Sequence, residues 1–179
     1  MRSALLVCIA FAAFFANANT TLVDAFSELK LVNQSKVSGQ FEQHKKIKVL
    51  KNSIVSAGSF SADQSGFVWQ QKTPIASTIR MDEHGIYSKD HRGNESQMTN
   101  ADLYIPLLQA LLLQDPVKLS DYLQVQSVVD NCINLSANEP LDQVFSAVKL
   151  CGTGTISRIV LSEQAGHTTE INLTYAAAN

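Results

Sequence analysis

The stretch QFEQHKKIKV, residues 40–49, decides how the rest of the sequence is interpreted. Its even positions are all polar, whereas the odd positions include Phe41, Ile47 and Val49. Alternation with a period of two is typical of a β-strand that buries one face and leaves the other in water. Further short strands are expected at about 55–62, 66–72, 75–83 and 85–90. The turn-forming residues between them predict an antiparallel meander.

Helical patterns surround this meander. Thr21 and Asp24 have the spacing of a capping box, and residues 103–114 are apolar on nearly every side. Helices are expected at about 21–33, 103–114 and 116–122. Four closing strands are expected at about 124–135, 144–151, 155–163 and 168–175. The pattern predicts an α+β fold in which one curved antiparallel sheet buries a face under the central helices.

The N-terminal segment has the pattern of an export signal. Arg2 is followed by an apolar run, residues 4–15, and then by Ala16-Asn17-Ala18, the small-residue spacing of a cleavage site. The run is shorter than the ~20 residues that cross a bilayer as a helix. We therefore expect a signal peptide at 1–18, a single domain at 19–179 and a periplasmic location. The alternative is a buried N-terminal helix.

Charge and motif content limit the function classes. The sequence has 14 Lys and Arg against 16 Asp and Glu, a net charge of −2. This balance argues against nucleic acid as a partner, and equally against an anionic membrane surface. The four histidines show no metal-ligand spacing, and no nucleophile-elbow motif occurs. No metal, cofactor or catalytic residue is therefore expected.

Two cysteines, Cys132 and Cys151, follow the expected cleavage site. Each is out of phase with the apolar residues of its predicted strand, so both should face the more polar side. An even pair in an oxidising compartment predicts a disulfide, with two free thiols as the alternative.

The order of motifs resembles that of the LolA-like lipoprotein carriers. Phe41-Glu42-Gln43 is similar to their F-x-Q, a glycine-containing strand follows at 56–60, and Phe67-Val68-Trp69 is similar to their aromatic-x-W strand. Pro74 and a strand ending at Gly85 come next. The strand end at 132–136 and the closing hairpin at 159–171 also resemble those of the carriers. The resemblance spans nearly the whole chain after residue 18.

This resemblance implies an incomplete β-barrel of about 9–11 strands, with a helical lid over an apolar cavity. It implies a monomeric carrier, not an enzyme, that takes the acyl chain of a lipoprotein from an inner-membrane donor to an outer-membrane acceptor. One departure is that the carriers place an Arg-Pro pair before the aromatic-x-W strand, where the arginine helps to hold the lid. Residues 62–65 of this chain contain no arginine. A similar branch accompanies aryl-polyene gene clusters, so another lipid-linked cargo is also open.

Nine apolar residues are predicted to line the cavity and bind an acyl chain. They are Phe60, Phe67, Trp69, Ile79 and Met81 from the strands, and Leu107, Leu108, Leu111 and Leu112 from the lid. Each buried CH₂ group gains about 0.8 kcal/mol, so a dozen give roughly 10 kcal/mol before ordering costs. The alternatives are an ordinary core, a protein that binds an envelope partner, or an enzyme on the same fold. For an enzyme, the polar candidates are Arg80, Tyr87 and Arg158.

Overall fold

The computed structural model describes residues 20–99 and 101–177, so the predicted signal peptide lies outside the described residues. The helices are α1 (Leu22–Glu28), α2 (Tyr104–Leu113), α3 (Pro116–Ser120) and the 3₁₀ helix η1 (Leu141–Gln143). The first six strands are β1 (Lys36–Lys46), β2 (Ile54–Asp63), β3 (Phe67–Thr73), β4 (Ser77–Asp82), β5 (Gly85–Lys89) and β6 (Glu95–Gln97). The other five are β7 (Leu123–Val129), β8 (Cys132–Ala137), β9 (Phe145–Cys151), β10 (Arg158–Glu163) and β11 (Thr168–Tyr175). Within the described ranges, no helix combines the length and the apolarity needed to cross a membrane.

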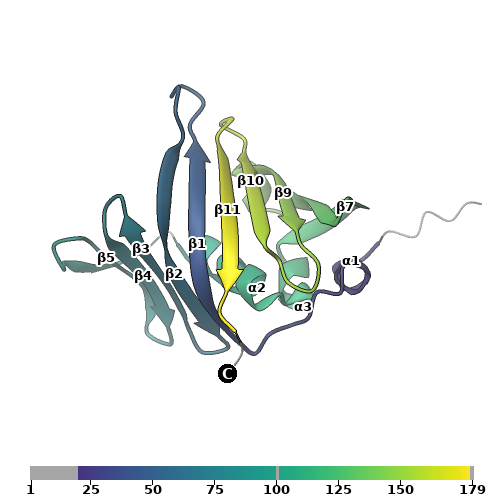
Figure 1. Ribbon diagram of the computed structural model, residues 1–179, viewed down its shortest axis with the longest axis horizontal. Coiled ribbons are helices and arrows are strands. Elements are labelled where there is room, and N and C mark those ends of the chain that lie inside the picture. Colours follow the sequence, from purple (N-terminus) through teal and green to yellow (C-terminus); the bar gives the residue numbers. More distant parts are fainter. Residues whose placement is uncertain (1–19, 100, 178–179) are drawn as a thin grey trace, which may run out of the picture.

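All eleven strands form one antiparallel sheet in the order β6-β5-β4-β3-β2-β1-β11-β10-β9-β8-β7. Nine of the ten pairings join strands that are neighbours in the chain, and the tenth joins β1 to β11. The edges β6 and β7 do not pair with each other, so the sheet stays open. Figure 1 shows α2 and α3 lying against one side of this sheet. The α+β class, the open barrel and the strand number of about 9–11 are confirmed.

Several predicted boundaries were wrong. The single strand expected at 124–135 is a hairpin of β7 and β8, which turns at Asp130 and Asn131. Both residues have positive φ angles, 53° and 58°, which the two-residue turns of hairpins require and Asp and Asn tolerate. Strand β6 was not predicted. Helix α1 ends at Glu28, earlier than expected, and Lys30 follows it with φ 56°.

The cysteine pair forms the predicted disulfide, which joins β8 to β9. Cys132 and Cys151 are direct partners in the strand register. Their neighbours Ile133 and Leu150 are fully buried in the core on the other face of the sheet. The two sulfurs therefore lie on the outer face, as the sequence predicted. Both cysteines are nevertheless buried there.

Replacing both cysteines by alanine should lower the free energy of unfolding by about 3 kcal/mol. A cross-link between residues 19 positions apart restricts the unfolded chain, and a loop of this length gives a loss of that size. Urea denaturation of the oxidised wild type and of the double variant measures the difference. Reduction of the wild-type chain should give the same shift. An unchanged midpoint in both experiments would contradict the prediction.

Candidate functional site

The inner face of the sheet carries a continuous group of large apolar side chains. The strand register places Phe60 of β2 opposite Trp69 of β3, and Trp69 opposite Ile79 of β4. Phe67 of β3 is likewise opposite Met81 of β4. Direct partners in a register share one face, so the five strand residues predicted to bind an acyl chain all face the same way. Phe60, Phe67 and Trp69 are buried, and Ile79 and Met81 are half-buried against them.

Phe41 of β1 completes this group and was not predicted as a site residue. Its ring stacks on Trp69 with the ring centroids 3.7 Å apart. The partner of Phe41 in β2 is Gly58, where an added Cβ would lie 1.9 Å from the backbone oxygen of Gln70. Alternation in the sequence predicted that Phe41 faces the buried side of its strand. Its contact with Trp69 was not predicted, because that contact depends on the registers of β1 with β2 and of β2 with β3.

Helix α2 packs near β2 and β1, and its leucines belong to the same hydrophobic cluster as the aromatic residues. Leu107, Leu111 and Leu112 are buried and Leu108 is half-buried. All nine predicted residues belong to, or pack against, one hydrophobic cluster. In this structure the aromatic residues and the leucines of α2 are therefore parts of one packed core.

Two glutamines attach α2 to the rest of the chain, and neither was predicted as a site residue. Gln109 donates through Nε2 to the backbone oxygens of Asp63 and Gly66, at 2.6 Å and 3.2 Å. These oxygens belong to the β2–β3 turn, the segment in which this sequence lacks the arginine of the LolA-like carriers. Gln109 is nearly fully buried. Its side chain therefore joins the middle of α2 to the turn between β2 and β3.

Gln114 holds the C-terminal end of α2. It ends the helix in the left-handed conformation, with φ 54°, and its side chain is completely buried. Its Oε1 accepts a hydrogen bond from the backbone nitrogen of Ile156 at 2.9 Å, and its Nε2 donates to the backbone oxygen of Val32 at 3.3 Å. This end of α2 is therefore joined to two distant segments of the chain.

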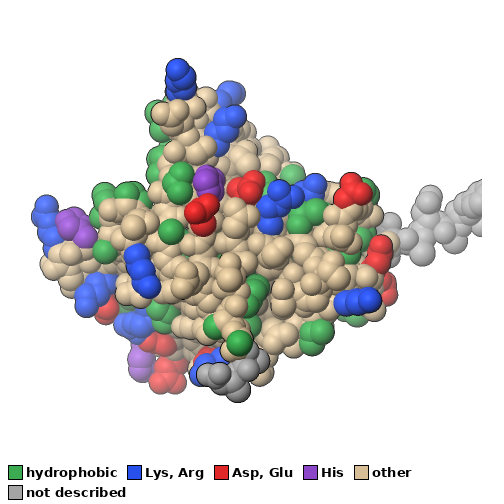
Figure 2. Space-filling model, viewed as in Figure 1, with side chains coloured by type: hydrophobic (Ala, Val, Ile, Leu, Met, Phe, Trp, Pro, Cys, Tyr) green, Lys and Arg blue, Asp and Glu red, His purple; other side chains and the backbone are tan. Residues whose placement is uncertain are grey.

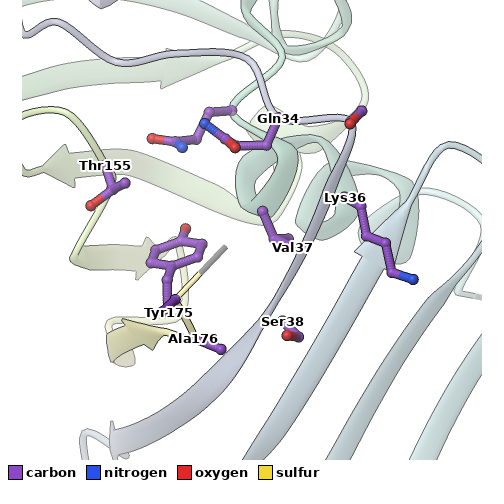
Figure 3. A pocket seen from close by; sticks show the side chains of 10 residues that line it. Gln34, Lys36, Val37, Ser38, Thr155, Tyr175 and Ala176 are labelled. Carbon is purple, nitrogen blue, oxygen red and sulfur yellow. The ribbon is translucent and has the colours of Figure 1, made fainter. Parts of the chain in front are cut away.

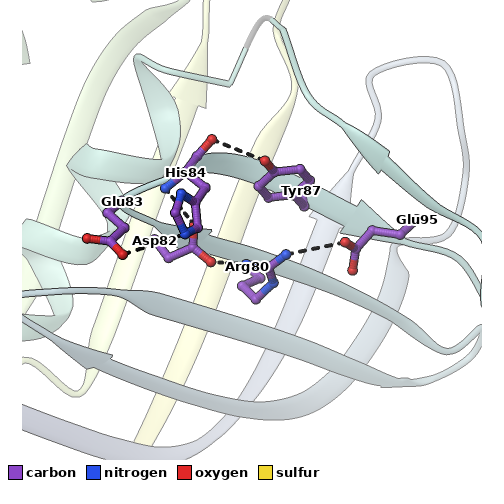
Figure 4. A network of polar contacts seen from close by, with 6 residues as sticks. All are labelled: Arg80, Asp82, Glu83, His84, Tyr87 and Glu95. Atoms are coloured by element: carbon purple, nitrogen blue, oxygen red, sulfur yellow. Dashed lines mark hydrogen bonds and ion pairs between the residues drawn. The ribbon is translucent and has the colours of Figure 1, made fainter.

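Arg80 and Tyr87, two polar candidates for an enzyme, lie away from the apolar interior. Arg80 is on the other face of β4 from Ile79 and forms ion pairs with Asp82 and Glu95. Its guanidinium carbon lies 4.6 Å from the centre of the Tyr87 ring. Figure 4 shows this network at the sheet surface, with the side chains pointing toward one another.

Arg158, the third candidate, donates to the sulfur of Cys151 on the disulfide side of the sheet. The polar candidates therefore do not converge on one site. Among the residues that the structure describes, no group of His, Cys, Asp or Glu has the arrangement of a metal site.

A pocket of about 690 Å³ opens beside the aromatic cluster. Residues 34–38, Gln114, Thr155 and residues 175–177 line it, and none of the nine predicted residues does. The Tyr175 ring packs edge-on against Phe60, with centroids 5.5 Å apart. Its hydroxyl is buried without a hydrogen-bond partner among the described residues, and burial raises the pKa of this hydroxyl far above its usual value. Figure 3 shows the hydroxyl pointing toward the Gln34 side of the pocket.

Comparison with known proteins supports the fold class. No family model and no curated protein sequence matches the chain. Its structure is similar to that of a LolA superfamily protein from Nitrosomonas europaea, with a TM-score of 0.51 and 8% identity over 89% of this chain and 94% of that one.

Two further solved structures are more distant. A DUF1329 family protein from Desulfovibrio piger has a TM-score of 0.45 and 8% identity over 87% of this chain and 92% of that one. A domain described as an outer membrane lipoprotein-sorting protein, from Vibrio parahaemolyticus, has a TM-score of 0.46 and 8% identity over 88% and 93%. The likeness to the Nitrosomonas protein confirms the LolA-like fold.

Proposed function

We propose, starting from the LolA-like fold, that this chain is a periplasmic carrier that holds an acyl chain between the aromatic face of its sheet and α2. The observation that carries the proposal is the fold itself, an open sheet whose aromatic inner face is covered by a helix rich in leucine. The cargo is the acyl chain of a lipoprotein or of another lipid-linked molecule. The carrier receives it from an inner-membrane donor and passes it to an outer-membrane acceptor.

The cargo takes the place of α2 on the aromatic face. The leucines of α2 are packed in the same hydrophobic cluster as the aromatic residues, so α2 must move outward before an acyl chain can enter. The polar contacts that resist this movement include the hydrogen bonds of Gln109 and Gln114 and the one that the backbone nitrogen of Gln34 donates to the backbone oxygen of Leu113. Each such bond contributes about 1 kcal/mol net. The displaced leucines stay covered, because they pack against the acyl chain instead of the sheet. A dozen buried CH₂ groups gain roughly 10 kcal/mol, so cargo binding can offset the broken hydrogen bonds.

The pocket beside Tyr175 is the place for the polar end of the cargo. It lies one aromatic ring from the cluster, because Tyr175 contacts Phe60 and Phe60 lies near Trp69. Among the residues that the structure describes, the hydroxyl of Tyr175 has no hydrogen-bond partner, and a buried hydroxyl gains from one. An ester or amide carbonyl at the head of an acyl chain can accept that hydrogen bond.

Titration of the chain with a fatty-acyl probe should shift the fluorescence of Trp69, which is the single tryptophan of the sequence. Trp69 is stacked on Phe41 and buried in the hydrophobic cluster that includes the leucines of α2, so an acyl chain that enters this cluster changes its surroundings. Mass spectrometry of the purified protein identifies any lipid that it already holds. A silent titration, together with lipid-free protein from cells, would rule out the proposed function.

A further inference from the structure

The β1–β2 hairpin has a concentrated positive charge at its tip. Residues 45–55 contain four lysines and no acidic residue, although the chain as a whole has a net charge of −2. Lys45 forms an ion pair with Glu163 at 3.3 Å. Lys46, Lys48 and Lys51 have no ion pair within the described part of the chain. The tip therefore keeps about three uncompensated positive charges in a chain that is acidic elsewhere.

The same tip exposes apolar side chains to an unusual degree. Val49 is 86% exposed and Leu50 is 46% exposed, and both lie between Lys48 and Lys51. Ile54 and Val55, at the start of β2, are exposed at 45% and 46%. Single exposed apolar residues are common on protein surfaces, but grouped ones indicate an interaction site.

The tip projects from the molecule and has a defined shape. Figure 1 shows the β1–β2 hairpin rising above the rest of the sheet, and Figure 2 shows Lys or Arg side chains at this point with hydrophobic side chains beside them. The backbone nitrogen of Leu50 donates to the backbone oxygen of Ile47 at 2.9 Å. The backbone nitrogen of Lys48 donates a hydrogen bond to Nδ1 of His167, in the β10–β11 turn, at 3.2 Å. The lysines and the apolar residues thus lie together on a turn whose backbone is held by hydrogen bonds.

We propose that this tip docks the chain on a membrane surface rich in anionic phospholipid. Val49 and Leu50 enter the interface between the headgroups and the acyl chains, while Lys46, Lys48 and Lys51 contact the lipid phosphates. An apolar tip surrounded by basic residues is the arrangement by which proteins lie at membrane interfaces. A projecting turn also reaches a flat surface without obstruction. The charge argument made from the whole sequence was therefore too coarse, because the positive charge is local.

The expected effects follow from the two kinds of contact. Each lysine near an anionic surface strengthens binding about five-fold. The double substitution Lys48→Gln and Lys51→Gln should therefore weaken binding to anionic vesicles about 25-fold. Each buried CH₂ group contributes a factor of about four, so Val49→Ser with Leu50→Ser should weaken binding at least about ten-fold.

Co-sedimentation with vesicles tests the proposal, using mixed phosphatidylglycerol and phosphatidylcholine vesicles against phosphatidylcholine alone. The chain should start at Asn19, since every described helix and strand lies after that residue and the apolar run 4–15 would itself enter a bilayer. We expect binding to the anionic vesicles that falls steeply between low salt and about 0.5 M salt, where screening shortens to a few ångströms. Circular dichroism checks that each variant is folded.

Matched substitutions at the other end of the molecule serve as controls. Lys30→Gln with Lys118→Gln removes the same charge, and Val117→Ser with Val129→Ser removes apolar side chains that are 69% and 53% exposed. Both controls should bind the vesicles as the parent chain does. The proposal is wrong if the parent chain binds neither vesicle, or if the controls lose as much binding as the tip variants. The proposal is also wrong if the tip variants bind the anionic vesicles as well as the parent chain does. That result would mean that another part of the surface makes the contact.

Discussion

The substitution Leu108→Glu should abolish acyl-chain binding and leave the chain folded. Leu108 is half-buried on α2 at the margin of the hydrophobic cluster, so a glutamate there can reach water while α2 is closed. With an acyl chain beneath α2, the same carboxylate would lie against CH₂ groups, and burying an unpaired charge costs several kcal/mol. We expect binding at least about 100-fold weaker, measured by titration of Trp69 fluorescence with a fatty-acyl probe.

Two substitutions control for this result. Leu108→Met keeps the volume and apolarity of the side chain, and should bind the probe nearly as well as the parent chain. Val117→Glu places the same charge on α3, at a position that is largely exposed, and should have no effect on binding. If the folded Leu108→Glu chain binds as the parent does, the acyl chain does not lie beneath α2.

The substitution Phe67→Glu should unfold the chain. Phe67 is 1% exposed and lies inside the cluster. Loss of a buried phenylalanine costs about 3–5 kcal/mol, and an unpaired carboxylate in its place adds several more. Because domains are stable by only about 5–15 kcal/mol, most or all of the stability is lost. Circular dichroism and urea denaturation measure the effect.

Phe67→Leu is the matched control for that position. It keeps an apolar side chain and should lower the free energy of unfolding by about 1–2 kcal/mol. A Phe67→Glu chain that unfolds at the same urea concentration as the Phe67→Leu chain would show that position 67 is open to solvent. The difference between positions 67 and 108 follows from burial alone, which makes Leu108 the better place to test cargo binding.

Strands that run without interruption were predictable because alternation is a local property. Phe67 and Trp69 of β3 share a face in the structure as alternation requires. The hairpin of β7 and β8 was missed because two phase shifts cancel. A bulge after Val125 moves the inward position to Val128, and the turn at 130–131 moves it back to Ile133. Val125 and Ile133 thus stay in phase across a reversal of the chain, whereas Val129, which has the same phase in the sequence, is exposed.

Contacts between distant segments were not predictable in the same way. A bulge at Ser146 brings Phe145 to the inner face, where it packs edge-on against Tyr104 of α2. Gln109 and Gln114 stand in an otherwise apolar helix, and that irregularity is the one signal that could have marked them. Their partners at Gly66 and Ile156 are known only once the chain is folded. The apolar positions also predict only that these side chains face the interior. They do not distinguish an interior filled by α2 from one that binds a cargo.

The strand order has a consequence for the rate at which the chain folds. Nine pairings join consecutive strands, so the segment from β1 to β6 and the segment from β7 to β11 can each assemble through short loop closures. The ladder between β1 and β11 brings together strands from opposite ends of the described chain, and such long closures are slow. We expect it to form last. Until then both strands are bare edges, on which another chain could add a strand, and aggregation during refolding should begin there.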